Sequence, residues 1–269
     1  MQIFDTIITH HELLCDNILL LKVRLIDTIS PPTFMGGVGG DDLSLGLPGQ
    51  FYQIKVPGDD FQIRVPISIY DIEDDEISFL IKIVGEKTTK LKNMKLNDEL
   101  NIIGPLGNSF TYAKNESYMF VSGGCGYAPL NFLHKFIPDN KTLWIHGGRT
   151  KDEVKFAVSG QKAQIICTDD GSEGIKGFVT SEVSKELYIQ GYDKVYACGP
   201  NPMLKEIMSI CRLFNKKLYV SMEAYMGCGI GVCYGCAVKL RNNKGTYTYA
   251  RVCKDGPIFN AYSIVWEEL

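Results

Sequence analysis

The chain has 269 residues and a formal net charge of −3, from 28 basic and 31 acidic side chains, and 45% of its residues are hydrophobic. This length suits two domains, or one large domain with an appendage. The near-balanced charge gives no basic stripe for nucleic acid, and no apolar run is long enough to span a bilayer. We therefore expect a globular protein of the reducing cytoplasm, with neither nucleic-acid nor membrane partners.

The first 112 residues predict a small antiparallel β-barrel. Short runs with strand character are separated by turn residues, such as those that follow Val56. The expected strands are Ile3–Ile8, Ile18–Leu25, Phe51–Val56, Ile67–Tyr70, Ile77–Val84 and Glu99–Ile103. The glycine- and proline-rich stretch from Ser30 to Gly49 predicts a long surface loop, which inside a compact domain is usually functional or disordered.

Residues 113–221 show short apolar runs that alternate with helical patterns. The expected strands are Tyr118–Val121, Thr142–His146, Gln164–Cys167 and Lys194–Ala197, and the expected helices are Ala128–Phe136, Ser181–Ile189 and Pro202–Phe214. This alternation predicts a parallel sheet with right-handed crossovers. Ligands bind such sheets at the carboxyl ends of the strands, where Gly123, Gly124 and Gly126 fall.

Residues 222–269 carry four cysteines with an informative spacing. Cys228, Cys233 and Cys236 form a C-x4-C-x2-C run, and sixteen residues separate Cys236 from Cys253. This is the plant-type ferredoxin spacing for a [2Fe–2S] cluster. The glycines between these cysteines allow tight turns and close approach of backbone amides to sulfur. We predict that the four cysteines are cluster ligands and that the protein transfers electrons.

Other uses of the cysteines remain open at this point. Zinc is one alternative, because the Cys233–Cys236 pair has zinc-like spacing and two more cysteines could complete a tetrahedron. Disulfides are disfavoured, because the nine cysteines are an odd number and the first residues lack the order of a secretory signal. Cys15, Cys167 and Cys211 lie in apolar surroundings and are interpreted as core residues.

Several motifs lie along the chain in a recognisable order. They are Pro48-Gly-Gln-Phe51, Val65-Pro-Ile-Ser68, Val121–Leu130, Tyr196–Met203, Glu223–Cys236 and Arg251–Phe259. With these motifs, nearly the whole chain resembles the ferredoxin–NADP reductase superfamily, and within it the electron-transfer subunits of class 1B dihydroorotate dehydrogenases. The resemblance implies an α+β multi-domain fold: an antiparallel FAD-binding β-barrel over 1–112, a parallel-sheet α/β NAD-binding domain over 113–221, and a [2Fe–2S] segment over 222–269.

The resemblance assigns a flavin-contacting Arg-Pro-x-Ser motif to Val65, Pro66, Ile67 and Ser68, with Val65 in the arginine position. Arg64 is displaced by one residue. Because adjacent strand residues point to opposite faces, Arg64 can replace the missing arginine only through a local bulge.

The family's next flavin segment corresponds to Leu80, Ile81, Lys82, Lys87 and Thr88. Lys87 stands where the family has glycine. We hypothesise that Lys82 or Lys87 supplies the positive charge that Val65 lacks, although Lys87 fits a solvated loop lysine equally well.

The resemblance also assigns Gly123, Gly124 and Gly126 to a nucleotide pyrophosphate, at the start of a helix. Cys198 is expected beside the nicotinamide and the flavin, where it shapes the hydride-transfer site without acting as a covalent nucleophile. By composition alone, Cys198 would be a buried small residue. The adjacent carboxylates of Asp169 and Asp170 disfavour a 2′-phosphate, which favours NADH over NADPH, but they could also form an exposed turn.

These parts imply hydride transfer between NAD(H) and FAD, with single electrons passing between FAD and the cluster. The expected partner is an FMN-containing dihydroorotate dehydrogenase catalytic subunit, in a heterotetramer with two of each subunit, and electrons flow from dihydroorotate to NAD⁺. One alternative is the small flavin subunit of an NADH-dependent ferredoxin:NADP oxidoreductase, in which an aspartate typically replaces one cluster cysteine. A zinc- or cluster-bearing interaction module without flavin is the alternative of another class.

Overall fold

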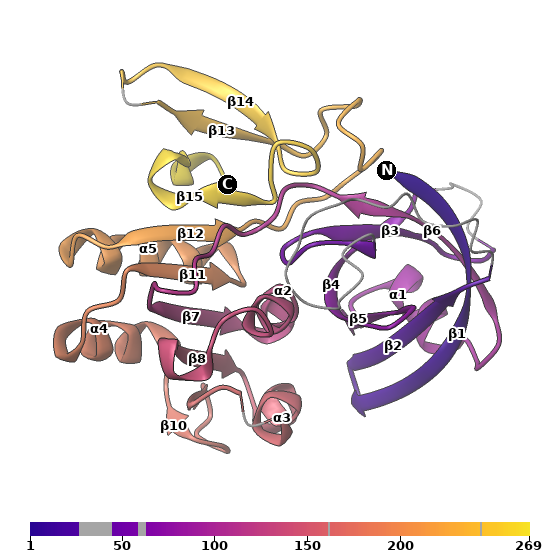
Figure 1. The fold of residues 1–269 in the computed structure, drawn as a ribbon, viewed down its shortest axis with the longest axis horizontal. Helices are drawn as coiled ribbons and strands as arrows, with labels where there is room; N and C mark the ends of the chain where they lie inside the picture. The colour runs from indigo at the N-terminus through magenta and orange to yellow at the C-terminus, as the bar shows by residue number, and fades with distance from the viewer. Residues whose placement is uncertain (27–44, 59–62, 161, 243) are drawn as a thin grey trace.

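The computed structural model describes residues 1–26, 45–58, 63–160, 162–242 and 244–269 as a barrel, a larger sheet and a C-terminal hairpin (Figure 1). The closed antiparallel barrel has the strand order β1 (Gln2–Cys15), β2 (Ile18–Leu25), β5 (Glu76–Lys82), β4 (Val65–Glu73), β3 (Phe51–Lys55) and β6 (Glu99–Leu106). Alternate residues of these strands fill one apolar interior. The short helix α1 (Glu86–Lys92) packs on that interior through Leu91.

The larger sheet has the strand order β10 (Ile175–Lys176), β9 (Ile165–Thr168), β8 (Thr142–Gly148), β7 (Tyr118–Gly123), β11 (Lys194–Cys198), β12 (Lys217–Ser221) and β15 (Ile258–Asn260). Its pairs are parallel except for β12 with β15. The crossing helices are α2 (Tyr127–His134), α3 (Lys151–Ser159), α4 (Val179–Ile189) and α5 (Asn201–Leu213). Figure 1 shows α2 and α3 on one side of this sheet, with α4 and α5 on the other.

The central strand β7 shows how the sequence builds these two layers. Met119 and Val121 pack in the apolar cluster that includes α4 and α5. Tyr118 and Phe120 pack in the cluster that includes α2 and α3. Because strand residues alternate between faces, a strand that is apolar throughout can be covered by helices on both sides. The second cluster also contains Leu80 of β5, so the barrel and the sheet share one apolar interface.

The C-terminal segment forms a two-stranded sheet of β13 (Ala237–Arg241) and β14 (Tyr247–Arg251). Val238 and Cys253 are buried in the same cluster as α4 and α5, and β15 completes the edge of the large sheet beside β12. The segment is therefore held by both strand pairing and apolar packing.

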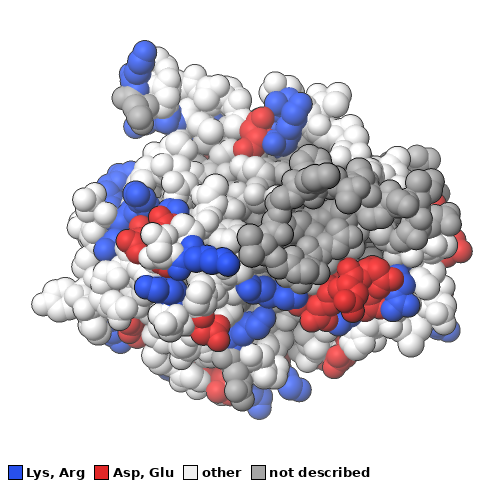
Figure 2. Space-filling model, viewed as in Figure 1, with Lys and Arg blue, Asp and Glu red and all other residues white. Residues whose placement is uncertain are grey.

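Charges of both signs intermingle on the described surface. Over the barrel half of the face in Figure 2, an acidic group lies next to lysine and arginine side chains. Several of the barrel's charges are paired, including Arg24 with Glu76 at 2.7 Å and Lys22 with Glu73 at 3.5 Å.

The structure confirms the predicted fold class of an antiparallel barrel, a parallel-sheet α/β domain and a C-terminal segment. The predicted strands and helices all appear. The elements that were not anticipated are helices α1 and α3 and strands β10, β12, β13, β14 and β15. Residues 30–44 of the predicted Ser30–Gly49 loop lie outside the described residues. None of the helices in the described ranges has the length and apolar character needed to cross a membrane.

Candidate functional site

The direction of Val65 in strand β4 follows from the neighbouring strand β3. Val65 lies opposite Ile54, and Ile67 lies opposite Tyr52. Residues opposite each other in antiparallel strands share a face, and both Ile54 and Tyr52 are fully buried in the barrel interior. Val65 and Ile67 therefore face the barrel core, where an arginine would have to bury its charge.

The other face of these strands points toward the C-terminal segment. Pro66 lies opposite Gln53 and Ser68 lies opposite Phe51. Gln53 is fully buried although its side chain is polar. Its Nε2 is 3.7 Å from Met226 Sδ, and its Oε1 has no hydrogen-bond partner among the described residues. An unpaired amide oxygen at this position is suited to accept a hydrogen bond from a bound ligand.

Arg64 is held by strand β6. Its guanidinium donates to the Asn101 carbonyl at 2.9 Å and also to Asn101 Oδ1. Burial lowers the pKa of Arg64, and the charge of Asp5 acts in the opposite direction. The β3–β4 register is regular from Val65 to Ser68, and Arg64 directly precedes this strand. Arg64 would have to leave Asn101 to reach a bound phosphate.

The two candidate lysines lie in different places. Lys82 Nζ is 3.6 Å from Glu153 Oε1 of α3, at the junction of the barrel and the sheet. Lys87 Nζ donates to the Ile63 carbonyl, just before β4 begins. Lys87 is therefore the lysine closer to the start of the predicted flavin strand.

The remaining barrel candidates have structural contacts of their own. Leu80 packs in the interface cluster, and Ile81 is fully buried in the barrel interior. Thr88 Oγ1 accepts hydrogen bonds from the amides of Val84 and Gly85 at 3.0 and 3.1 Å, which caps the start of α1.

The glycine-rich turn brings Gly123, Gly124 and Gly126 together with Cys198. A Cβ on Gly126 would lie 2.2 Å from the Cys198 carbonyl oxygen, and one on Gly123 would lie 2.9 Å from Met203 Sδ. These two glycines allow the turn to pack against β11 and α5. Gly124 has a φ of +54° and nothing within 4 Å of its Cβ position, so it alone leaves open space before α2.

Ser122, which stands where the family has glycine, is part of a buried polar network. Its Oγ accepts a hydrogen bond from Trp144 Nε1 at 2.8 Å and lies 2.8 Å from His146 Nδ1. Burial lowers the pKa of His146 to about 3, so the ring is neutral at physiological pH. Ser122 can therefore donate to His146, which ties β7 to β8 directly behind the glycine turn.

Cys198 is the last residue of strand β11 and is buried in the apolar cluster between the sheet and the barrel. Burial raises the pKa of its thiol, with Glu223 and Cys125 adding to the effect while a hydrogen bond from Ser221 opposes it. Glu223 remains accessible to solvent, yet surrounding protein atoms desolvate its carboxyl and raise the pKa, against the attraction of Lys82. A protonated, buried thiol is suited to a packing role rather than to nucleophilic attack.

The acidic pair lies at the carboxyl end of β9. The amide of Asp169 donates to the Gly148 carbonyl at 3.2 Å, next to the end of β8. The Asp170 carboxylate accepts hydrogen bonds from Ser172 N at 2.9 Å and Ser172 Oγ at 2.6 Å, and these bonds lower its pKa. Both aspartates are exposed beside Arg149, but only Asp170 has its carboxylate held within the turn.

The four C-terminal cysteines are arranged as two pairs. Cys228 Sγ accepts the amides of Val232 and Cys233 at 3.3 and 3.4 Å, and Cys236 Sγ accepts the amide of Cys253 at 3.5 Å. In the part of the chain that the structure describes, no three His, Cys, Asp or Glu side chains converge as a metal site. The pairs would have to draw together around a bound group.

The chemistry of this loop fits an iron–sulfur cluster. Burial would raise the pKa of Cys228, but amides of Cys233, Ile230 and Val232 outweigh it and lower the pKa to about 6. Amides directed at sulfur are a feature of cluster loops. Cys253 differs, because burial raises its pKa to about 12 and the neighbouring Cys236 adds to the shift. Binding of a cluster at Cys253 must therefore displace a firmly held proton.

Gln53 is the site residue that the sequence did not reveal. A Cβ on Gly229 would lie only 2.1 Å from Gln53 Nε2, so the barrel touches the loop directly after Cys228. A single polar residue within the apolar run of β3 is the signal that could have drawn attention to it.

Comparison with known proteins places this geometry in a family. Residues 223–265 match the family model described as the iron–sulfur cluster binding domain of dihydroorotate dehydrogenase B. The electron transfer subunit of dihydroorotate dehydrogenase B (NAD(+)) from Caldanaerobacter subterraneus subsp. tengcongensis is 39% identical over 81% of this chain and 87% of its own. The corresponding subunit from Desulforamulus reducens is 34% identical over 91% of this chain and 97% of its own.

A solved structure of an NADH-dependent reduced ferredoxin–NADP oxidoreductase, described in connection with flavin-based electron bifurcation, is similar with a TM-score of 0.79. It is 25% identical and the match covers 98% of this chain and 91% of that one. The fold is thus that of the ferredoxin–NADP reductases. The chain belongs to the family of dihydroorotate dehydrogenase B (NAD(+)) electron transfer subunits. The predicted resemblance to this family is confirmed. The alternative, an NADH-dependent ferredoxin–NADP oxidoreductase subunit, has a lower sequence identity of 25%, compared with 39% for the dihydroorotate dehydrogenase B subunit.

We expect Gly229→Ala to impair assembly of the cysteine loop, because the new methyl meets Gln53 and the backbone has a φ of +69°. Gly245→Ala is the matched control, with a φ of +77° and nothing within 4 Å of the Cβ position. Both substitutions cost about 1–2 kcal/mol of left-handed backbone strain, and only the first meets a neighbour. Iron and sulfide analysis of the purified variants should show loss in Gly229→Ala alone. Equal contents in the two variants would count against the contact.

Proposed function

We propose that this protein carries electrons between NAD(H) and a dihydroorotate-oxidising partner subunit, by way of FAD and a [2Fe–2S] cluster. One observation carries the proposal: Gln53, opposite Pro66 of the predicted flavin strand, packs against Met226 and Gly229 of the cysteine loop. The two predicted cofactor sites therefore adjoin each other. Membership of the family supports the same cofactors.

When bound, FAD and a [2Fe–2S] cluster would supply the redox chemistry, namely hydride exchange with NAD(H) and transfer of single electrons. The chain's own residues would hold and orient them. We assign the cluster to Cys228, Cys233, Cys236 and Cys253, the nucleotide to Gly123, Gly124 and Gly126, and the flavin to Arg64, Val65, Pro66, Ile67, Ser68, Leu80, Ile81, Lys82, Lys87 and Thr88. Since Val65, Ile67 and Ile81 face the barrel core, they would contribute backbone groups and shape rather than side-chain contacts.

Cys198 would line the meeting point of nicotinamide and flavin. Its carbonyl packs on Gly126 and its thiol stays protonated, so it would exclude water and fix the spacing of the two rings. Around the cysteine loop, Val232 is 73% and Tyr234 is 55% exposed. These exposed side chains would contact the partner subunit and so place the cluster close to the interface.

We propose an FMN-containing catalytic subunit as the partner, in a heterotetramer of two subunits of each kind in the cytoplasm, with electrons flowing from dihydroorotate to NAD⁺. The names of the relatives support the partner. The likeness to an NADH-dependent ferredoxin–NADP oxidoreductase favours a second candidate, in which ferredoxin is the electron partner.

Cys233→Ser should separate NADH–flavin transfer from electron transfer through the cluster. We expect it to lower dihydroorotate-driven NADH formation by the reconstituted complex about 100-fold, because one cluster ligand is lost, while NADH still bleaches the flavin. Cys15→Ser, in the barrel, is the control and should retain both activities. The measurements are NADH fluorescence with the partner subunit and visible spectra without it.

Loss of NADH–flavin transfer in Cys233→Ser would contradict the order of the route. Turnover of the wild-type protein with ferredoxin and NADP⁺, but not with dihydroorotate and NAD⁺, would favour the second candidate.

Asp169→Asn should weaken discrimination against NADPH. The exposed Asp169 carboxylate would repel a 2′-phosphate, and its removal should raise the NADPH/NADH ratio of kcat/KM about tenfold, which corresponds to about 1.4 kcal/mol. Asp170 is left intact because it holds Ser172. Asp139→Asn, at the amino-terminal side of β8, is the matched control. An unchanged ratio in Asp169→Asn would mean that the carboxylate lies away from the bound ribose.

A further inference from the structure

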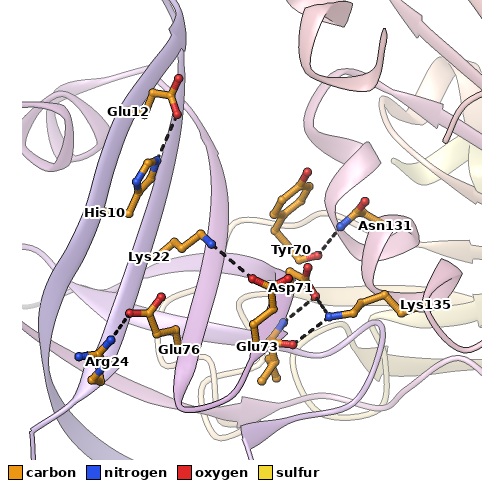
Figure 3. Close-up of polar contacts among 11 residues, drawn as sticks. His10, Glu12, Lys22, Arg24, Tyr70, Asp71, Glu73, Glu76, Asn131 and Lys135 are labelled. Carbon is orange, nitrogen blue, oxygen red and sulfur yellow. Dashed lines mark hydrogen bonds and ion pairs between the residues drawn. The ribbon is translucent and has the colours of Figure 1, made fainter. Parts of the chain in front are cut away.

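Helix α2 is bonded directly to the barrel hairpin formed by β4 and β5. Asn131 and Lys135 are four residues apart and therefore lie on one face of the helix and its last turn. Asn131 Nδ2 donates to the Tyr70 carbonyl at 3.0 Å, and Lys135 Nζ donates to Asp71 Oδ1 at 2.7 Å (Figure 3). Lys135 also donates to the Ile72 carbonyl at 3.1 Å.

The Tyr70 carbonyl needs this partner because Tyr70 lies in a β-bulge. Ile69 is opposite Phe79 and Asp71 is opposite Ser78, so Tyr70 is an extra residue without a partner on β5. Bulges interrupt the ladder and leave backbone groups to be satisfied elsewhere.

The orientation of the Asn131 amide is determined by its two partners. Asn131 Oδ1 accepts a hydrogen bond from Lys162 Nζ at 3.0 Å. Lysine can only donate and a carbonyl can only accept, so the amide has one allowed orientation between Lys162 and Tyr70. Asn131 is only 2% exposed, which leaves little room for water to replace either bond.

The two ends of this connection adjoin the two predicted cofactor sites. Helix α2 begins directly after the glycine turn at Gly123–Gly126, and the bulge at Tyr70 lies two residues after Ser68. A shift of α2 relative to β4 would therefore change the separation of the bound nucleotide and flavin. The apolar interface alone does not define that separation, because such packing is non-directional.

We propose that Asn131 and Lys135 are positioning residues, which set the distance between the nicotinamide and flavin sites by clamping α2 to the bulge of β4. The proposal rests on the proposed function. Hydride transfer needs reacting atoms within about 3–3.5 Å, and a misplacement of about 1 Å can cost 100-fold in rate. The clamp should therefore affect the rate of hydride transfer more than the affinity for NADH.

Lys135→Ala tests the clamp, and Lys135→Arg is the variant that should rescue it. In anaerobic stopped-flow experiments, we expect Lys135→Ala to lower the limiting rate of flavin reduction by NADH about tenfold or more. The Kd for NADH and the FAD content should remain at wild-type values. Lys22→Ala is the matched control, because Lys22 pairs with Glu73 of the same hairpin at 3.5 Å without leaving the barrel (Figure 3).

A second readout does not depend on the cofactors. In the cofactor-free protein, Asn131→Ala and Lys135→Ala should speed amide hydrogen exchange at Tyr70, Asp71 and Ile72, and Lys22→Ala should not. This readout tests the clamp even if the wild-type protein is not reduced by NADH, a result that would defeat the proposed function instead. If Asn131→Ala does not fold, the test uses Lys135→Ala and Asp71→Asn, alone and combined. Non-additive effects on amide exchange would support the clamp, and additive effects would contradict it.

Wild-type exchange and a wild-type limiting rate in Lys135→Ala would overturn the proposal. An equal loss of rate in Lys22→Ala would also overturn it, because the effect would then reflect general weakening of the hairpin. Faster exchange at the bulge, together with a slower limiting rate and an unchanged Kd, is the supporting result.

Discussion

Helix α2 packs between the sheet and the barrel and holds these two parts of the molecule together. All eight residues of α2 are buried. On the sheet side, Tyr127 stacks on Trp144 with ring centroids 4.2 Å apart, and on the barrel side Asn131 bonds to the bulge of β4. The helix therefore fixes the glycine turn, the parallel sheet and the predicted flavin strand relative to one another.

The position of the cysteine loop depends indirectly on this packing, because the loop contacts strand β3 of the barrel. Gln53 faces the loop because β3 alternates between the barrel interior and the outer surface, and Gly229 gives it space by having no side chain. The loop is also anchored through Val238 and Cys253 to the core under α4 and α5. A change in either sheet would thus be transmitted to the predicted cluster ligands through packed side chains.

Local patterns in the sequence were sufficient for the barrel strands, most strands of the parallel sheet and most helices, because each depends on residues close in the chain. The sequence also predicted that Arg64 and Val65 would face opposite sides of a strand, and the pairing of Val65 with Ile54 places Val65 toward the barrel core. It could not reveal that Arg64 is held by Asn101, since that bond joins residues 37 positions apart.

Long-range contacts also account for the missed features of the site. The bond between Asn131 and Tyr70 joins residues 61 positions apart, and the bulge that requires it depends on the register of β4 with β5. Helix α1 has only seven residues, and Gly85, which precedes it, has no side chain to mark its start. The sequence predicted Gly123, Gly124 and Gly126 as nucleotide-binding residues, but only the packing separates Gly123 and Gly126, which fit against neighbours, from Gly124, which leaves open space.

In the proposed route, one chain joins a nucleotide site, a flavin site and an iron–sulfur site. The most direct test is an anaerobic NADH titration of the purified protein, followed by visible absorption and electron paramagnetic resonance. We predict bleaching of the flavin bands together with the appearance of a one-electron-reduced [2Fe–2S] signal. A colourless protein that contains zinc and does not respond to NADH would rule out this electron route.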